Sequence, residues 1–147
     1  MFTKSKLSNN YNQVNREKTV DNIPFVVYFS RKNDKNSEQL LSGFIESYLQ
    51  HPAGYPHQLL FIKKGYQEFE NEWQKLTTPL AHLDFVVMEV PDRNYCFGYY
   101  RELLKQYPEN YFLFLTAHSK ILVDNWLDLY MCHAKPNRLL GGTATYC

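Results

Sequence analysis

The predicted fold is decided by residues 111–126, which read Tyr-Phe-Leu-Phe-Leu-Thr-Ala-His-Ser-Lys-Ile-Leu-Val-Asp-Asn-Trp. The apolar run at 111–115 is too short for a buried helix and does not alternate with polar residues. It therefore predicts a strand covered on both faces, as in a parallel sheet. Polar residues follow directly, from Thr116 to Ser119. Because open α/β sheets bind ligands beside the carboxyl ends of their strands, we expect the functional chemistry there.

Strand-like and helix-like stretches alternate along the rest of the chain. Runs of apolar, β-branched and aromatic residues predict strands at 23–29, 58–62, 83–90 and 111–115, and a last strand at about 138–145. Apolar residues at helical spacing predict helices at 37 to about 49, at about 66 to 76, from about 97 and from about 123. This order predicts an α/β fold of three layers, with a mostly parallel sheet and helices on both faces.

Several side chains in these helices have a predicted place. Ser37 is expected to cap the first helix. The apolar spacing puts Leu49 on the buried face of the first helix, and Phe97 and Leu104 on that of the third. Asp124 is expected in the first turn of the fourth helix, where a carboxylate suits the helix dipole.

Composition narrows the class of protein and its partners. Residues 1–21 carry few apolar side chains and predict a flexible leader, so residues 22–147 are expected to form the folded domain. The 147 residues have a formal net charge of +1, which gives no global attraction to nucleic acid. No apolar run approaches the length of a bilayer span, so no membrane span is expected. Three cysteines without paired spacing favour a reducing, cytoplasmic location.

The segment Phe114–Ser119, followed by Asn125-Trp126-Leu127, resembles a motif of family 2 glycosyltransferases. The motif runs Phe-Leu-Asp-Ala-Asp-Asp, then a short link, then Gly-Trp-Leu. The resemblance implies the GT-A fold, which is Rossmann-like, and transfer of a sugar from a nucleotide-diphospho-sugar donor to an acceptor that the sequence does not identify. In that family the two acidic positions hold Mn²⁺ or Mg²⁺. Thr116 and His118 occupy them here.

The resemblance also implies which strand ends lie together. It gives a sheet order of third, second, first and fourth predicted strand, which reverses between the first and the fourth. The loop Ser30–Asp34 would then lie beside the loop Thr116–Ser119, at the preferred ligand crevice. The segment Asp92–Tyr100 is similar to an Asp-x-Gly-x-Asp-x-x-Ala-Tyr element of some bacterial members, with Asn94 at the glycine position and Cys96 at the second aspartate position.

Basic side chains follow all four strands and are expected to share one rim of the sheet. They are Arg31, Lys32, Lys35, Lys63, Lys64, Arg93, His118 and Lys120. Charged donors bind phosphate oxygens more strongly than neutral donors do, so such a rim suits a diphosphate. Charged residues are also common in solvent-exposed loops that bind no ligand. For each single residue, this alternative explanation stays open. The residues expected to bind the donor are Ser30, Arg31, Lys64, Asp92, Asn94, Thr116 and His118.

Two questions stay open at this level. His118 has three readings: a metal ligand, a contact to the donor without metal, or a side chain without a role. The catalytic base is not located, because in the family it follows the last predicted strand. The chain is then a fragment, or is completed by a second domain or subunit, or is a non-catalytic GT-A-like module, and an interaction domain without a nucleotide site is a further alternative.

Overall fold

The computed structural model describes residues 2–4, 23–93, 96–108, 110–136 and 140. They form one five-stranded sheet in the order β1-β4-β3-β2-β5. The strands are β1 (Phe2–Lys4), β2 (Phe25–Arg31), β3 (Gln58–Lys64), β4 (Phe85–Val90) and β5 (Phe112–Leu115). Strands β2 to β5 run parallel, and β1 pairs antiparallel with β4. The predicted mostly parallel sheet is confirmed, and so is the predicted order of its four parallel strands.

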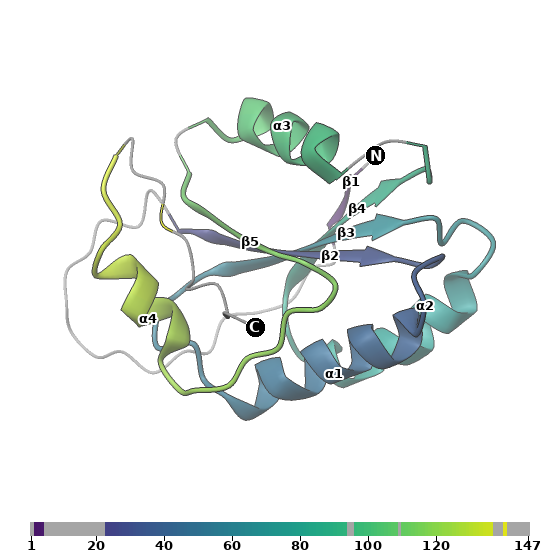
Figure 1. The fold of residues 1–147 in the computed structure, drawn as a ribbon, viewed down its shortest axis with the longest axis horizontal. Coiled ribbons are helices and arrows are strands. Elements are labelled where there is room, and N and C mark those ends of the chain that lie inside the picture. The colour runs from purple at the N-terminus through teal and green to yellow at the C-terminus, as the bar shows by residue number, and fades with distance from the viewer. Residues whose placement is uncertain (1, 5–22, 94–95, 109, 137–139, 141–147) are drawn as a thin grey trace, which may run out of the picture.

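Helices cover both faces of this sheet, which makes three layers (Figure 1). The helices are α1 (Ser37–Gln50), α2 (Glu70–Thr77), a 3₁₀ turn η1 (Thr78–Leu80), α3 (Cys96–Gln106) and α4 (Trp126–Met131). Figure 1 shows α3 on one face and α1, α2 and α4 on the other. The predicted three-layer α/β architecture is therefore confirmed.

The two central strands, β2 and β3, carry unbroken apolar runs at 25–29 and 59–62 because both of their faces are covered there. Val26 and Tyr28 of β2 enter the core under α1, α2 and α4, whereas Phe25 and Val27 enter the core under α3. On β3, Leu59 lies in the core under α1, α2 and α4, and Leu60 lies in the core under α3. Successive side chains of a strand point to opposite faces, so a strand without alternation is the sequence expected for a doubly covered position.

Helix ends and faces depart from the sequence prediction at five side chains. Asn36, not Ser37, occupies the N-cap of α1, in a left-handed conformation with φ 62°, and Ser37 is the first helical residue. Asp124 precedes α4 and lies outside its first turn. Leu49, Phe97 and Leu104 are exposed where burial was predicted. Helical spacing gives the width of an apolar stripe, but the neighbouring element decides how much of it is covered.

The N-terminal segment adds a strand to the edge of the sheet. The predicted leader, residues 1–21, contains strand β1, whose residue Phe2 pairs with Met88 of β4. Residues 5–22 lie outside the described part, and so does the last predicted strand except for Leu140.

The loop that follows α1 positions the start of α4. Backbone N–H groups of Asn125 and Leu127 donate to the carbonyl oxygens of Pro52 and Ala53, at 2.7 and 3.0 Å. Gly54 has a φ of 76°, and a Cβ atom there would lie 2.7 Å from Oδ1 of Asn125. The two segments can approach this closely only because residue 54 has no side chain.

Candidate functional site: the carboxyl edge of the sheet

The loop that leaves β5 starts beside the last residues of β2, because β5 ends at Leu115 opposite Tyr28 whereas β2 continues to Arg31. Strand β2 pairs with β3 on one side and with β5 on the other, so the strand order reverses at β2. The buried Tyr28 hydroxyl, from the middle of β2, donates to the Ala117 carbonyl oxygen at 2.8 Å and joins this strand to the loop after β5. Burial raises the pKa of Tyr28 well above its usual value, so this hydroxyl keeps its proton. The predicted switch point is present.

Four residues at the ends of β2, β3 and β4 form what we call the Asp92 cluster: Asp92, Arg31, Asn33 and Lys64. Arg31 binds the Asp92 carboxylate with two nitrogens, Nε to Oδ1 at 3.0 Å and Nη2 to Oδ2 at 3.2 Å. Asn33 Nδ2 donates to Oδ2 at 2.6 Å, and Lys64 Nζ lies 3.3 Å from Oδ1. Each carboxylate oxygen thus faces two donors, three of the four contacts coming from charged groups.

This arrangement stabilises the ionised form of Asp92. Hydrogen bonds from Arg31, then from Asn33 and Lys64, lower the pKa of the Asp92 carboxyl to about 2. The same pair raises the pKa of Arg31. Asp34 lies 3.6 Å from the remaining Arg31 nitrogen, Nη1. Two carboxylates therefore face the two cations Arg31 and Lys64.

Lys64 is the least accessible charge of the cluster, with a side chain only 7% exposed. Its ammonium lies 5.9 Å from the ring centre of Phe29 and 5.8 Å from that of Tyr99. Gly65 follows in a left-handed conformation, φ 74°, and a Cβ atom there would lie 3.3 Å from the Asp92 Cβ. Glycine at 65 therefore lets the turn after β4 approach the end of β3.

Strand geometry divides the predicted basic rim between the two faces of the sheet. Lys63, next to Lys64, points to the opposite face, where it pairs with Glu70 and lies over the Trp73 ring. Lys32 pairs with Glu72 on α2. Neighbouring residues of a strand alternate between faces, so Lys63 and Lys64 at the end of β3 do not share one surface. Four of the eight predicted rim residues thus form two groups of ion pairs, Arg31 and Lys64 in one and Lys32 and Lys63 in the other.

The other predicted donor-binding residues lie outside the Asp92 cluster. The buried Ser30 hydroxyl hydrogen-bonds the Tyr66 hydroxyl at 3.0 Å, on the face of α1 and α2. Thr116 is exposed, and its backbone N–H donates to the Ser119 hydroxyl at 3.0 Å. His118 is exposed in the same loop. Asn94 lies outside the described residues. Among the described candidates, the structure thus brings together Arg31, Lys64 and Asp92 but not Ser30, Thr116 or His118.

The described residues do not fit a divalent cation at this edge. In the ranges 23–93, 96–108 and 110–136, no three His, Cys, Asp or Glu side chains are grouped so that they could hold a metal ion. Thr116 and His118 add no carboxylate where the family places two. Magnesium and calcium require several oxygen ligands, so this edge has no preformed site for them.

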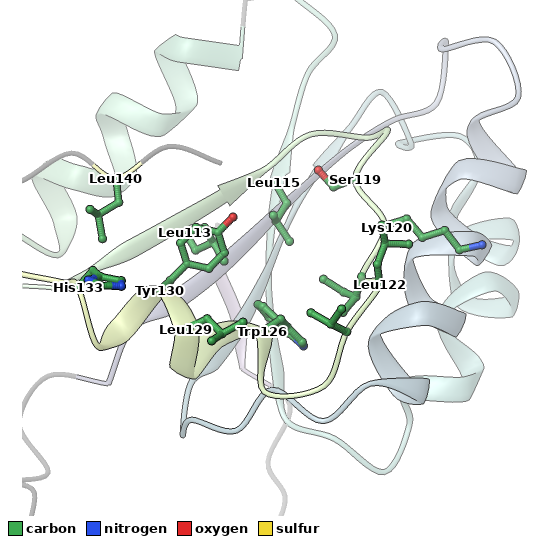
Figure 2. A pocket seen from close by; sticks show the side chains of 12 residues that line it. Leu113, Leu115, Ser119, Lys120, Leu122, Trp126, Leu129, Tyr130, His133 and Leu140 are labelled. Carbon is green, nitrogen blue, oxygen red and sulfur yellow. The ribbon is translucent and has the colours of Figure 1, made fainter. Parts of the chain in front are cut away.

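An apolar pocket of about 570 Å³ lies beside β5, under the loop 119–123 and α4 (Figure 2). Most of its walls are aliphatic or aromatic, from Leu113, Leu115, Ile121, Leu122, Val123, Trp126, Leu129 and Leu140. Ser119 lines one end, and Figure 2 shows the Lys120 side chain extending away from the apolar walls. Leu122 and Leu129 are 74% and 59% exposed. The volume falls in the range of pockets that hold small organic molecules.

Sequence reasoning missed two parts of this region. Asn33 lies inside the loop recognised as ligand-facing, yet nothing in its spacing indicated a bond to Asp92, 59 residues away. The apolar pocket depends on how the loop 119–123 is folded, which carries no periodic signal. An apolar stretch inside a loop, such as Ile121–Val123, is the one feature that could have drawn attention.

Comparisons with known proteins give no family for this chain. No protein-family model, no curated protein and no solved structure matches it. Within the described residues, none of the helices combines the length and the apolar character that crossing a bilayer requires.

Proposed function

We propose that the chain is a GT-A-like domain that binds a nucleotide-diphospho-sugar at the carboxyl edge of its sheet and transfers the sugar to an acceptor. One observation carries this: the strand order reverses at β2, and Arg31 and Lys64 stand at the ends of β2 and β3. A topological switch point is where α/β sheets place their ligands, and Arg31 offers the planar fork that suits phosphate.

In the proposed reaction, the cations of the Asp92 cluster stabilise negative charge on the leaving group. As the bond between sugar and diphosphate breaks, negative charge grows on the leaving diphosphate, and fixed cations stabilise that charge. Arg31 would bind the phosphate oxygens with two nitrogens, and Lys64 would add a point charge. Thr116 and His118 line the neighbouring loop and would face the sugar side of the donor. The donor, the acceptor and a cytoplasmic location stay predictions from the sequence.

A second candidate is a GT-A-like module that binds the donor without catalysis. The observation that favours it is the replacement of both acidic positions by Thr116 and His118, in a region without a grouped set of metal ligands among the described residues. Such a module would retain affinity for the nucleotide diphosphate because the cations belong to the sheet edge.

Titration calorimetry with UDP-glucose and a dTDP-sugar, each with and without Mn²⁺, tests donor binding. We expect saturable binding that weakens about tenfold or more in Arg31→Ala, because a bidentate charged hydrogen bond is lost. Arg101→Ala is the matched control, since Arg101 is an exposed arginine on α3 outside the cluster. Equal affinity in the wild type and Arg31→Ala would count against the proposed site.

A hydrolysis assay with the same sugars separates the two candidates. Release of free UDP or dTDP above the rate without protein supports the transferase. Binding without release supports the non-catalytic module. Absence of binding to all the sugars, at millimolar concentration, contradicts both and favours an interaction domain.

A further inference from the structure

The donors of the Asp92 cluster form a complete binding site for an oxyanion. Arg31, Asn33 and Lys64 come from two separate strand ends and their loops, and all three converge on one carboxylate. Carboxylate and phosphate both present paired oxygens to a guanidinium fork, so a site of this kind accepts either group. The difference is that the occupant here belongs to the chain itself.

We propose that the Arg31, Asn33 and Lys64 donors are an oxyanion-binding site whose resident occupant is Asp92, and that a diphosphate displaces it. The inference deepens the proposed function, on which its biological meaning rests. It makes Asp92 an internal competitor of the ligand, where the sequence suggested a residue that contacts the ligand.

Accessibility allows this exchange. The Arg31 side chain is 40% exposed and the Asp92 side chain is 19% exposed, so solvent reaches both partners. Asp92 lies in a turn directly after β4, where the chain has left the sheet. Moving its carboxylate into water breaks no strand pairing, because the last paired residue of β4 is Val90.

Charge favours replacement of the Asp92 carboxylate by a diphosphate. The Lys64 side chain is only 7% exposed, so departure of the carboxylate removes one counter-charge from a poorly solvated ammonium. A diphosphate carries more negative charge than one carboxylate and restores the pairing. Protonation does not open the site near neutral pH, since the pKa of Asp92 is about 2. The trigger is therefore another anion.

Calorimetric titration with inorganic pyrophosphate at low salt tests the exchange. Asp92→Asn should bind pyrophosphate at least tenfold more tightly than the wild type, because the amide keeps the shape of Asp92 but not its charge. Asp128→Asn makes the same change in net charge at an exposed site on α4 and should behave as the wild type. Adding Arg31→Ala to Asp92→Asn should remove the gain.

Two results would overturn the proposal: affinities of Asp92→Asn and wild type within twofold of each other, or a gain that survives Arg31→Ala. If Asp92→Asn does not fold, NMR of the wild type decides. Pyrophosphate should then shift the Arg31 Nε–H and Asn33 side-chain amide resonances together, and unchanged resonances at saturating pyrophosphate refute the exchange.

The titrations distinguish a failure of the proposed nucleotide-sugar binding from a failure of the proposed exchange. A tenfold gain for pyrophosphate in Asp92→Asn, with no binding of UDP-glucose to either protein, supports the oxyanion site and contradicts the nucleotide-sugar proposal. Binding of UDP-glucose to the wild type, with no gain in Asp92→Asn, keeps the donor and overturns the exchange.

Discussion

The Asp92 cluster lies at the ends of β2, β3 and β4, whereas the apolar pocket lies beside β5, and the two differ in how their side chains are satisfied. In the cluster, each oxygen of the central carboxylate meets two donors from the chain itself. In the pocket, large apolar side chains such as Leu122 and Leu129 remain open to water. The comparison teaches that a charged site can have its polar groups paired within the chain, whereas an apolar site can leave large side chains exposed to water. Burying polar groups without partners is costly, whereas exposing single apolar residues is common.

The largest effect should come from the floor of the pocket. Trp126 is buried, and its indole N–H donates to the His51 carbonyl oxygen at 3.2 Å. Trp126→Ala should lower the free energy of unfolding by about 3–5 kcal/mol, because it leaves a large cavity and an unpaired carbonyl. Urea unfolding measures this. Leu129→Ala, on the exposed wall, should change it by less than about 0.5 kcal/mol, and similar losses in both variants would remove the distinction between floor and wall.

A smaller effect is expected at the buried cation of the cluster. Lys64→Ala should cost about 2 kcal/mol of unfolding free energy, less than a fully buried pair, because Asp92 keeps Arg31 and Asn33. Lys64→Met retains an apolar stem against Phe29 and Tyr99 and should cost about half as much. Chemical unfolding of both variants gives the answer. Equal stability of Lys64→Ala and the wild type would mean that the pairing contributes nothing net.

The cluster should also show itself in the pH dependence of stability. The folded state lowers the pKa of Asp92 to about 2, so the carboxylate stabilises the fold fully above about pH 4. That contribution is lost as the pH falls from about 4 toward 2. Unfolding free energies of the wild type and Asp92→Asn, in buffer without phosphate, should therefore converge over this range. A constant difference between the two proteins would show that Asp92 does not titrate as described.

The smallest effect should appear at the mouth of the pocket. The dye ANS should bind there weakly, and Leu129→Glu should reduce its affinity a few-fold by placing a charge on the apolar wall. Leu104→Glu is the control, because Leu104 is a half-exposed leucine on α3, on the opposite face of the sheet. ANS fluorescence titrations report both. An equal loss in the two variants would indicate binding without a defined pocket.

The sheet was predictable from the sequence because a buried strand has a local pattern, an unbroken run of apolar residues. The apolar run at 111–115 predicted a strand covered on both faces, those at 23–29 and 58–62 predicted further strands, and the resemblance supplied their order, which the structure confirms. Helix faces were less predictable: Phe97 and Leu104 fit an apolar stripe on α3 but remain exposed. Local spacing cannot say how far a covering layer extends.

The site was predictable only as a neighbourhood. Arg31, Lys64 and Asp92 were expected at one edge of the sheet and are in contact there. The sequence could not show that they bind each other, since ion pairing between residues about thirty to sixty positions apart depends on side-chain direction. The same limit made Lys63 and Lys64 look equivalent, although they face opposite sides of the sheet.

The backbone bonds from the loop after α1 to the start of α4 bear on the order of folding. Helix α4 has only six residues, too few to persist alone, and its first N–H groups rely on carbonyls more than seventy positions earlier. Such distant partners are joined late, after the intervening strands have assembled. We therefore expect α4 to form after the transition state, so that crowding Gly54 with a methyl group would accelerate unfolding and leave the refolding rate nearly unchanged.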